Sequence, residues 1–433
     1  MFNCAPALAL LAKRCETDER DALNRQFGKG TLEMNDIRLG RLQPLAPDPL
    51  LSITAAYRAD DRAGKIDLGV GVFKDEAGAT PIMRSIANAH DQFSTLEKTK
   101  AYIGPKGWPG FAAAGAALIA GDEASPALLE RIVTTPTPGG CGALRLAGDL
   151  LRQLRPTAKV WLSDPTWPNH APIFSACGFE IAKYPYFSID EGLKEGAMLA
   201  ALEQAAPGDI VVLHACCHNP TGEDLTEAAW AAVTRICVER NLLPLIDSAY
   251  HGLGDGLEQD LAGLRSVLNA VPEAFVCYSF SKNMGLYRER VGLLAFLGET
   301  HDEAKAVDSH ILAAARQNYS MPPTYGEALA FLTLDDKTLR ADWRVELSSM
   351  RERIKMLRAG AVDALGVHFG DNRFNYLNRQ KGMFSMLPLS ADQIARAREE
   401  HAVYIAPGGR INICGLPQDR LDEFASAIAA VSG

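Results

Sequence analysis

The segment SFSKNMGLYRERVG, residues 279–292, places a lysine directly after an apolar run and among small hydroxyl residues. A lysine in this position is either a solvated surface charge or a buried amine, and a buried amine of lowered pKa can condense with a carbonyl compound. Arg290 follows Lys282 by eight residues, and its guanidinium suits a phosphate because it can donate two parallel hydrogen bonds. With the hydroxyl of Ser279, the segment indicates amine chemistry beside an anion site.

A glycine-rich turn stands in PTPGGCGALR, residues 136–145. Gly139, Gly140 and Gly142 leave the backbone open where a helix is expected to begin. The free N–H groups of a helix N-terminus bind anions, and phosphate is a frequent occupant. Taken alone, the turn could equally be an ordinary connection between a strand and a helix.

Three further motifs carry polar or aromatic side chains, and each has a structural alternative. Trp167 of DPTWPNH could stack on a planar ring or lie in the core. Asn219 of CCHNPTG offers an amide or marks a common Asn-Pro turn. Asp247 of DSAYHG ends an apolar run, where a carboxylate needs a cation such as a protonated ring nitrogen, or caps the next helix. Tyr250 lies three residues further on and could reach the same ligand.

These groups together fit one cofactor, pyridoxal 5′-phosphate. It requires a phosphate site, a lysine that condenses with its aldehyde, and an acidic partner for its ring nitrogen.

The elements that must position these residues form an alternating pattern between residues 130 and 300. The predicted strands are RIVTT (131–135), AKVWLS (158–163), DIVVLHA (209–215), LLPLID (242–247) and EAFVCYSF (273–280). Helical stretches such as GALRLAGDLLRQL (142–154) separate them, which predicts an α/β fold with a mostly parallel sheet covered by helices on both faces. Ligands of such sheets lie beyond the carboxyl ends of the strands, where all the motifs above fall.

Helical patterns dominate after residue 300 and predict a smaller α+β domain. A long helix is expected over 340–366, strands within 383–388 and 410–415, and a last helix over 419–432. We expect a large domain at 76–340 and a small domain built from 34–75 and 341–433. Residues 1–33 are expected to be a dispensable extension without ordered structure, or an over-long start assignment.

Composition narrows the function class. A net charge of −9 over 433 residues argues against a nucleic-acid partner. The nine cysteines form no CxxC pair, which gives no zinc ligand spacing and indicates reduced thiols in a cytoplasmic protein. No apolar run reaches the roughly 18 residues of a membrane helix. We therefore predict neither a metal nor a membrane partner.

From about residue 42 onward the sequence resembles the class I aminotransferases, specifically the aspartate and aromatic amino acid group. CCHNPTG, DSAYHG, SFSKNMGLYRERVG and GRINICG stand in the family's order and spacing. The resemblance implies the fold type I of pyridoxal-phosphate-dependent transferases. It implies that Lys282 holds the cofactor, that Asp247 pairs with the ring nitrogen, and that Asn219 and Tyr250 bind the ring oxygen. It also implies ring stacking by Trp167 and a phosphate site made by Gly140, Cys141, Ser279 and Arg290.

The resemblance further implies a homodimer with shared active sites. Tyr102 would reach the phosphate bound by the neighbouring subunit, and Arg316 would be lent to a side-chain carboxylate of the neighbour's substrate. Arg410 would clamp the α-carboxylate. Gly71, with Trp167 and Asn219, would complete the substrate site.

Several positions depart from the family pattern. Cys141 stands where the family has threonine or serine, and a thiol donates poorly to phosphate. Met321 and Ala101 differ from a strict aspartate enzyme, whereas Val72, Lys74 and Thr80 agree with one.

The predicted activity is ping-pong transfer of an amino group between dicarboxylic or aromatic amino acids and 2-oxo acids such as 2-oxoglutarate. A strict aspartate aminotransferase, another pyridoxal-phosphate reaction such as β-elimination or decarboxylation, and a non-catalytic binding module are the alternatives.

Overall fold

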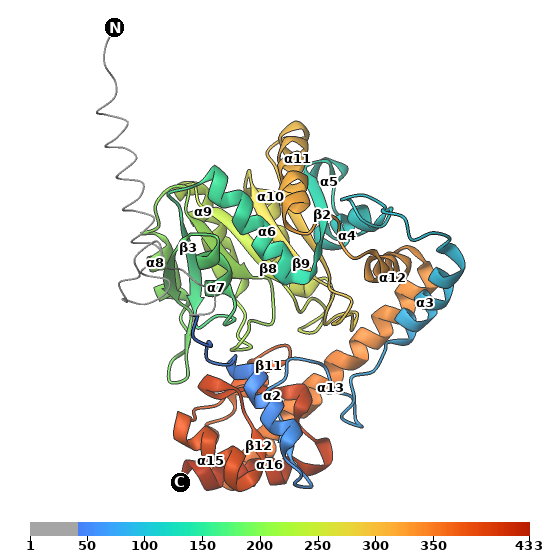
Figure 1. Cartoon of the computed structure of the whole chain (residues 1–433). Helices are drawn as coiled ribbons and strands as arrows, with labels where there is room; N and C mark the ends of the chain where they lie inside the picture. The colour runs from blue at the N-terminus through green and yellow to red at the C-terminus, as the bar shows by residue number, and fades with distance from the viewer. Residues whose placement is uncertain (1–41) are drawn as a thin grey trace. The chain divides into compact units, whose positions relative to one another are not determined.

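The computed structural model describes residues 42–433, of which Pro49–Gly433 forms one compact unit (Figure 1). Residues 42–48 belong to a separate unit, Met1–Asp48. The expectation for residues 1–33 lies outside the described residues.

A seven-stranded sheet forms the centre of the compact unit, in the order β2-β10-β9-β8-β7-β3-β4 (Figure 1). Its strands are β2 (Ile132–Pro138), β3 (Lys159–Asp164), β4 (Glu180–Pro185), β7 (Ile210–His214), β8 (Leu243–Ser248), β9 (Ala274–Ser279) and β10 (Val291–Leu297). β10 runs antiparallel to its two neighbours, and the other strands share one direction. The mostly parallel sheet is therefore confirmed, and each of the five predicted runs is a strand.

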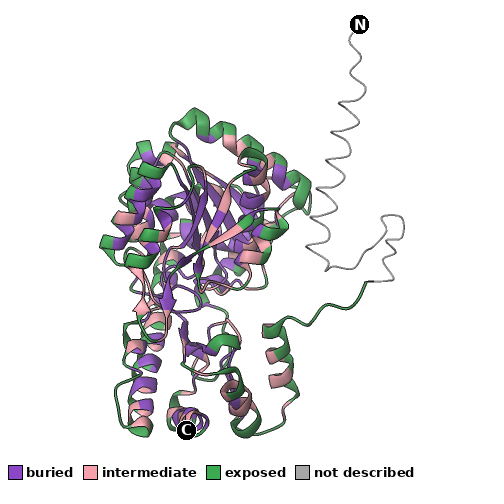
Figure 2. Ribbon diagram, turned by 90° about the vertical axis from the view of Figure 1, so that its left-hand side faces the viewer, coloured by how far each residue is buried: buried purple, intermediate pink, exposed green. Residues whose placement is uncertain are grey.

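Both faces of the sheet are buried, as Figure 2 shows. Ile210 and Val212 of β7 face one hydrophobic cluster, and Val211 and Leu213 face the other, which is the period of two expected of a strand. The helices around the sheet are α3 (Arg84–Leu96), α4 (Phe111–Ala120), α5 (Pro126–Glu130), α6 (Gly139–Leu154), α7 (His170–Ala176), α8 (Glu195–Leu202), α9 (Glu227–Arg240), α10 (Ala262–Ala270), α11 (His301–Asn318) and α12 (Thr324–Asp335). α6 packs on β9 and β10 at the centre of the sheet, which brings its first turn to the carboxyl ends of the parallel strands.

Two small sheets outside the central one involve the C-terminal part of the unit. Parallel strands β1 (Ile66–Asp67) and β12 (Val403–Tyr404) pair with each other, and β11 (Phe384–Met386) pairs antiparallel with β13 (Arg410–Asn412). The surrounding helices are α2 (Pro49–Ala59), α13 (Lys337–Phe369), α14 (Tyr376–Arg379), α15 (Ala391–His401) and α16 (Leu421–Ser432). Because α13 is continuous, the predicted boundary at residue 340 falls in its first turn, and the domain limits stay a prediction. Within residues 42–433, every helix is too short or too polar to cross a bilayer.

Glu327 of α12 is a buried carboxyl group that makes stability depend on pH. Its Oε2 accepts a hydrogen bond from the N–H of Trp108 at 2.8 Å, and its Oε1 has no partner among the described residues. Burial raises the pKa of Glu327 from 4.5 to about 8, although the Trp108 N–H opposes the shift. Between these pH values the folded chain keeps a proton that the unfolded chain has lost, so the free energy of unfolding falls as pH rises.

Replacing this group by glutamine should remove that pH dependence. Glu327→Gln keeps the acceptor for Trp108 and does not titrate, so its melting temperature should exceed that of the wild type by about 2–4 °C near pH 9 and match it near pH 5. Calorimetry across this range checks the expectation. Glu299→Gln, at an exposed glutamate, is the control. Parallel curves for wild type and Glu327→Gln would contradict the assignment.

Candidate active site

One pocket lies at the carboxyl ends of the parallel strands. Its lining consists of Gly140, Cys141, Leu144, Trp167, His214, Asn219, Asp247, Ala249, Tyr250, Ser279, Ser281, Lys282 and Arg290. Every residue predicted to contact the cofactor is among them except Tyr102. The sheet therefore gathers residues from five separate connections at one point.

The wall at the start of α6 is backbone rather than side chain. Gly139 has φ +72°, and a Cβ there would lie 2.5 Å from Nη2 of Arg290. A Cβ at Gly140 would lie 3.1 Å from Cβ of Ser279. The guanidinium and the hydroxyl thus pack directly against the first turn of the helix, whose N–H groups favour an anion.

Neighbouring side chains orient the polar groups of this wall. The hydroxyl of Ser279 donates to Oγ of Ser281 at 3.1 Å and accepts the N–H of Ser281 at 3.3 Å. Nη1 of Arg290 donates to the carbonyl of Tyr287 at 2.9 Å. The sulfur of Cys141 accepts a hydrogen bond from the amide of Asn169 at 3.3 Å, which leaves the thiol hydrogen available.

Asp247 is held at the end of β8 by His170. The two side chains meet at 3.1 Å, between Oδ2 and Nε2, and Asp247 is 8% exposed. Burial raises the pKa of Asp247, but the hydrogen bond from His170 and the positive charges of His170 and Lys282 outweigh it, so the pKa is lowered. The carboxyl group is therefore an anion inside the pocket.

A hydroxyl joins this histidine to a second one. Oγ1 of Thr166 lies 2.8 Å from Nδ1 of His170 and 3.3 Å from Nε2 of His214. Burial, followed by the charge of His170, lowers the pKa of His214 to about 3. His214 is thus neutral, and it accepts the N–H of Asn219 at 3.4 Å through Nδ1.

Asn219 and Tyr250 form a polar pair on the opposite side of the pocket. The amide nitrogen of Asn219 donates to the hydroxyl of Tyr250 at 3.1 Å. The amide oxygen of Asn219 is buried and lacks a partner among residues 42–433. Burial raises the pKa of Tyr250, so its phenol is protonated at neutral pH. A buried acceptor without a donor costs about 1–3 kcal/mol, and a ligand in the pocket would remove that cost.

The amine of Lys282 lies within this set. Its Nζ is 5.0 Å from the centre of the Tyr250 ring. Burial lowers the pKa of Lys282 from 10.5 to about 8; the charge of Asp247 raises it, whereas Arg290 and Arg410 lower it further. A much larger fraction of the amine is neutral near physiological pH than for a solvated lysine, and a neutral amine is the nucleophilic form.

Comparison with known proteins identifies the family of the chain that forms this pocket. The family model "Aminotransferase class I and II" matches residues 63–428. The chain belongs to this family.

The aminotransferase is similar over nearly its whole described length to proteins of known activity. It is 48% identical to the aromatic-amino-acid aminotransferase of Pseudomonas aeruginosa over 89% of this chain and 96% of that one. It is 40% identical to the aspartate aminotransferase of Escherichia coli over 89% of this chain and 97% of that one. The crystal structure of the aromatic-amino-acid aminotransferase of Burkholderia pseudomallei, covalently bound to pyridoxal phosphate, aligns with a TM-score of 0.88 at 42% identity, covering 91% of this chain and 100% of that one. The aminotransferase is thus an enzyme, a transaminase of the α/β class predicted from its sequence.

Of the residues predicted to bind substrate, Trp167 and Asn219 line the pocket of this aminotransferase, and the others lie outside its lining. Arg410 of β13 is 5% exposed and donates through Nη2 to the carbonyl of Gly69 at 2.6 Å. Its guanidinium lies 4.5 Å from the ring centre of Phe384, and that ring contacts Tyr250 edge to face at 5.7 Å. Gly71 is next to the same phenyl ring. Arg410 and Gly71 therefore lie beside Phe384, which packs against the pocket residue Tyr250.

The two residues predicted to act across a dimer do not reach the pocket of their own chain. Tyr102 is 89% exposed. Arg316 is exposed near the end of α11, where its guanidinium donates to the hydroxyl of Ser320.

Four pocket residues were not predicted, namely Leu144, His214, Ala249 and Ser281. A histidine that ends an apolar strand run, as in DIVVLHA, was a signal that could have identified His214. Leu144 and Ala249 carry no such signal, because small and apolar side chains are common at both buried and ligand-binding positions.

Proposed function

We propose that this aminotransferase uses pyridoxal 5′-phosphate to move amino groups between dicarboxylic or aromatic L-amino acids and 2-oxo acids such as 2-oxoglutarate, in a ping-pong sequence. The observation that carries the proposal is the convergence of the Lys282 amine, the Asp247 anion and the Arg290 guanidinium on one pocket. These are the three groups that the aldehyde, the ring nitrogen and the phosphate of the cofactor require.

The residues present fit this cofactor. The first turn of α6 with Arg290 and Ser279 offers a phosphate site from which two glycines exclude side chains. The buried amide oxygen of Asn219 has no donor among the described residues. The protonated phenol of Tyr250 could donate a hydrogen bond to the ring oxygen of the cofactor. Trp167 lines the pocket and would stack on the ring. Lys282, Asp247, Asn219, Tyr250, Trp167, Ser279, Arg290, Gly140 and Cys141 would hold the cofactor.

The bound cofactor supplies an electron-accepting ring that stabilises negative charge on the substrate α-carbon. Nζ of Lys282, whose lowered pKa makes its neutral form accessible, would remove the substrate α-proton as general base and would then deliver it as general acid to the cofactor carbon that carried the aldehyde. The carboxylate of Asp247, oriented by His170, would hold a proton on the ring nitrogen. His214 stays neutral and so keeps its acceptor for the Asn219 backbone.

Arg410 and Gly71 would fix the α-carboxylate of the substrate. The guanidinium is buried and carries an Nε without a partner among the described residues, so a planar anion could bind it in a forked arrangement. Holding the carboxylate fixes the direction of the labile Cα–H bond relative to Lys282. Such positioning can contribute several kcal/mol to the barrier reduction.

The breadth of the substrate range is part of the proposal. The relatives named above act on aromatic amino acids and on aspartate, and the chain mixes both patterns. Met321 and Ala101 depart from the pattern of a strict aspartate enzyme and are apolar, while Val72, Lys74 and Thr80 follow the aspartate pattern. A panel of amino donors with 2-oxoglutarate as acceptor tests the proposal; glutamate should form from aspartate, tyrosine and phenylalanine. Glutamate from aspartate alone would leave only the strict aspartate function.

The proposal includes a cytoplasmic homodimer with shared active sites. The exposure of Tyr102 and Arg316, away from the pocket of their own chain, supports a role in the neighbouring subunit. The described cysteines are free thiols, which is usual in a reducing compartment.

Reversing the charge at Arg316 should separate the two substrate classes. Arg316→Glu should lower kcat/KM for aspartate about 100-fold, because the side-chain carboxylate of a substrate enclosed between the subunits would lose its charge partner, at a cost of about 2–5 kcal/mol. Phenylalanine should lose far less, since its ring has no carboxylate for Arg316. Steady-state kinetics with both donors measure the difference.

Lys305→Glu makes the same charge reversal at an exposed position of the same helix and serves as the control. Equal losses for aspartate and phenylalanine would contradict the role of Arg316.

A further inference from the structure

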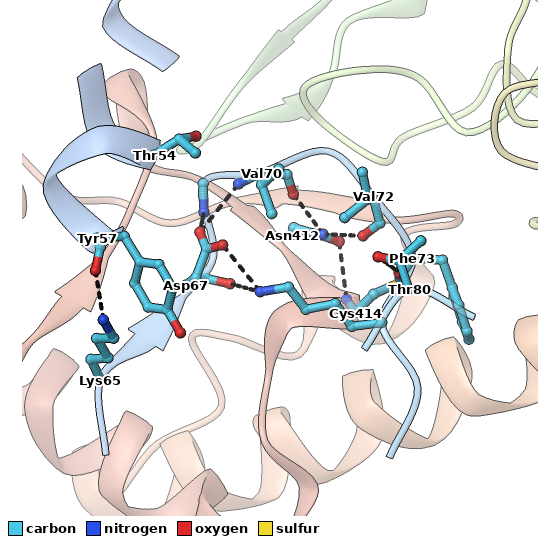
Figure 3. Close-up of polar contacts among 12 residues, drawn as sticks. Thr54, Tyr57, Lys65, Asp67, Val70, Val72, Phe73, Thr80, Asn412 and Cys414 are labelled. Atoms are coloured by element: carbon cyan, nitrogen blue, oxygen red, sulfur yellow. Dashed lines mark hydrogen bonds and ion pairs between the residues drawn. The ribbon is translucent and has the colours of Figure 1, made fainter. Parts of the chain in front are cut away.

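The strand that carries Arg410 also carries Asn412, two residues further along and therefore on the same side. Asn412 is completely buried. Figure 3 shows its amide between Val70 and Val72, and Nδ2 donates to the carbonyl of Val70 at 2.7 Å and to that of Val72 at 2.8 Å. The amide oxygen accepts the N–H of Cys414 at 3.1 Å, which fixes its orientation.

The segment that Asn412 contacts, residues 67–74, is closed on itself by an ion pair. Oδ2 of Asp67 lies 3.1 Å from Nζ of Lys74, and both side chains are largely buried. Oδ1 of Asp67 accepts the N–H groups of Gly69 at 3.1 Å and Val70 at 3.3 Å (Figure 3). The carboxylate of Asp67 thus fixes the first half of the segment, and its ion pair with Lys74 joins the two ends.

Most of the other peptide groups of this segment are also bonded. The carbonyl of Leu68 accepts the N–H of Asn412 at 2.8 Å, and that of Gly69 accepts Nη2 of Arg410. Phe73 donates its N–H to the hydroxyl of Tyr287 and accepts from the hydroxyl of Thr80, both at 2.9 Å. Within residues 68–73, only Gly71 has neither its N–H nor its carbonyl in a hydrogen bond to a described residue. The free peptide groups therefore stand at the centre of a fixed loop, flanked by the two carbonyls that Asn412 binds.

We propose that Asn412 is a positioning residue that holds the backbone on both sides of Gly71, so that strand β13 sets Gly71 and Arg410 together for one carboxylate. This rests on the proposed function, in which Arg410 and Gly71 bind the α-carboxylate of the substrate. Asn412 touches no substrate; it acts through the two carbonyls. Because every amino acid and 2-oxo acid shares the α-carboxylate, its removal affects all substrates equally.

The test uses the holoenzyme of Asn412→Asp, which keeps the shape and the acceptor for Cys414 but loses both donors. KM for aspartate and for phenylalanine should rise together about tenfold, and the dissociation constant of 3-phenylpropionate, a carboxylate without an amino group, should rise by the same factor. The fall in kcat should be smaller, and cofactor content should match the wild type. Asn412→Ser retains one donor and should lie between the two.

Lys65→Met is the matched control. It removes hydrogen bonds to the carbonyls of Tyr57 at 2.8 Å and Asp60 at 2.5 Å in the same part of the fold, outside the 67–74 loop. Its KM values should equal those of the wild type.

If Asn412→Asp does not fold, Asp67→Asn with Lys74→Met opens the same loop from its other end and should give the same parallel rise. Unchanged KM and dissociation constants in folded variants, or a loss confined to one donor, would overturn the positioning role. A wild type that transfers no amino group would contradict the proposed function instead, so the two failures are distinguishable.

Discussion

Lys282→Ala should abolish transamination and lower kcat by at least about 10⁴-fold, because general acid–base catalysis alone contributes about 10²–10⁴-fold. The substitution also removes the amine that would condense with the cofactor aldehyde. Coupled formation of glutamate from 2-oxoglutarate measures the loss. Borohydride reduction of the wild type should leave the cofactor on the peptide that contains Lys282, and the variant should release it on dialysis.

Lys282→Arg is the informative companion, since it keeps a positive charge that cannot condense with an aldehyde. It should be as inactive as the alanine variant. Wild-type rates in either variant would remove the mechanism, and a cofactor label on another lysine would relocate it.

Arg410→Leu should lower kcat/KM for every amino donor by about 10³-fold. The guanidinium is buried beside Phe384, so a carboxylate entering this site would lose its water without gaining a charge partner, which costs about 2–5 kcal/mol or more. The loss should be alike for aspartate and phenylalanine, unlike the selective loss expected at Arg316. Initial rates over a range of donor concentrations measure it.

Arg373→Leu, at an exposed arginine of the same C-terminal part, is the control and should leave the rates unchanged. Arg410→Lys keeps the charge but lacks the fork, so it should lie between wild type and leucine. An unchanged KM for aspartate in Arg410→Leu would contradict its role.

The sheet could be predicted from sequence where local patterns determine it, and not where pairing does. RIVTT and the other four apolar runs are strands, and they could be recognised because a buried parallel strand has a continuous apolar sequence. β10, Val291–Leu297, is equally apolar but follows the Arg290 motif directly and runs antiparallel, a direction that no local pattern reveals. β4, Glu180–Pro185, is an edge strand with charged residues and gives no apolar run.

The pocket could be predicted because its residues follow strand ends in the sequence. Asp247, Ser279 and Lys282 were predicted as site residues because ligands lie beyond the carboxyl ends of parallel strands. The contact between Asn412 and the 67–74 loop could not be predicted in this way, because Asn412 and Val70 are 342 residues apart in the chain. Glu327 and Trp108 are likewise 219 residues apart, so the burial of that carboxyl depends on tertiary contacts.

The pocket of Lys282 and the proposed carboxylate site of Arg410 and Gly71 are completed at different times during translation. All the residues that line the pocket of Lys282 lie between Gly140 and Arg290. The 67–74 loop is synthesised before this pocket. Asn412, which donates hydrogen bonds to that loop, lies 342 residues after Val70 and is synthesised near the end of the chain. A nascent chain can thus contain every residue of this pocket while it still lacks β13, the strand proposed to receive the amino acid.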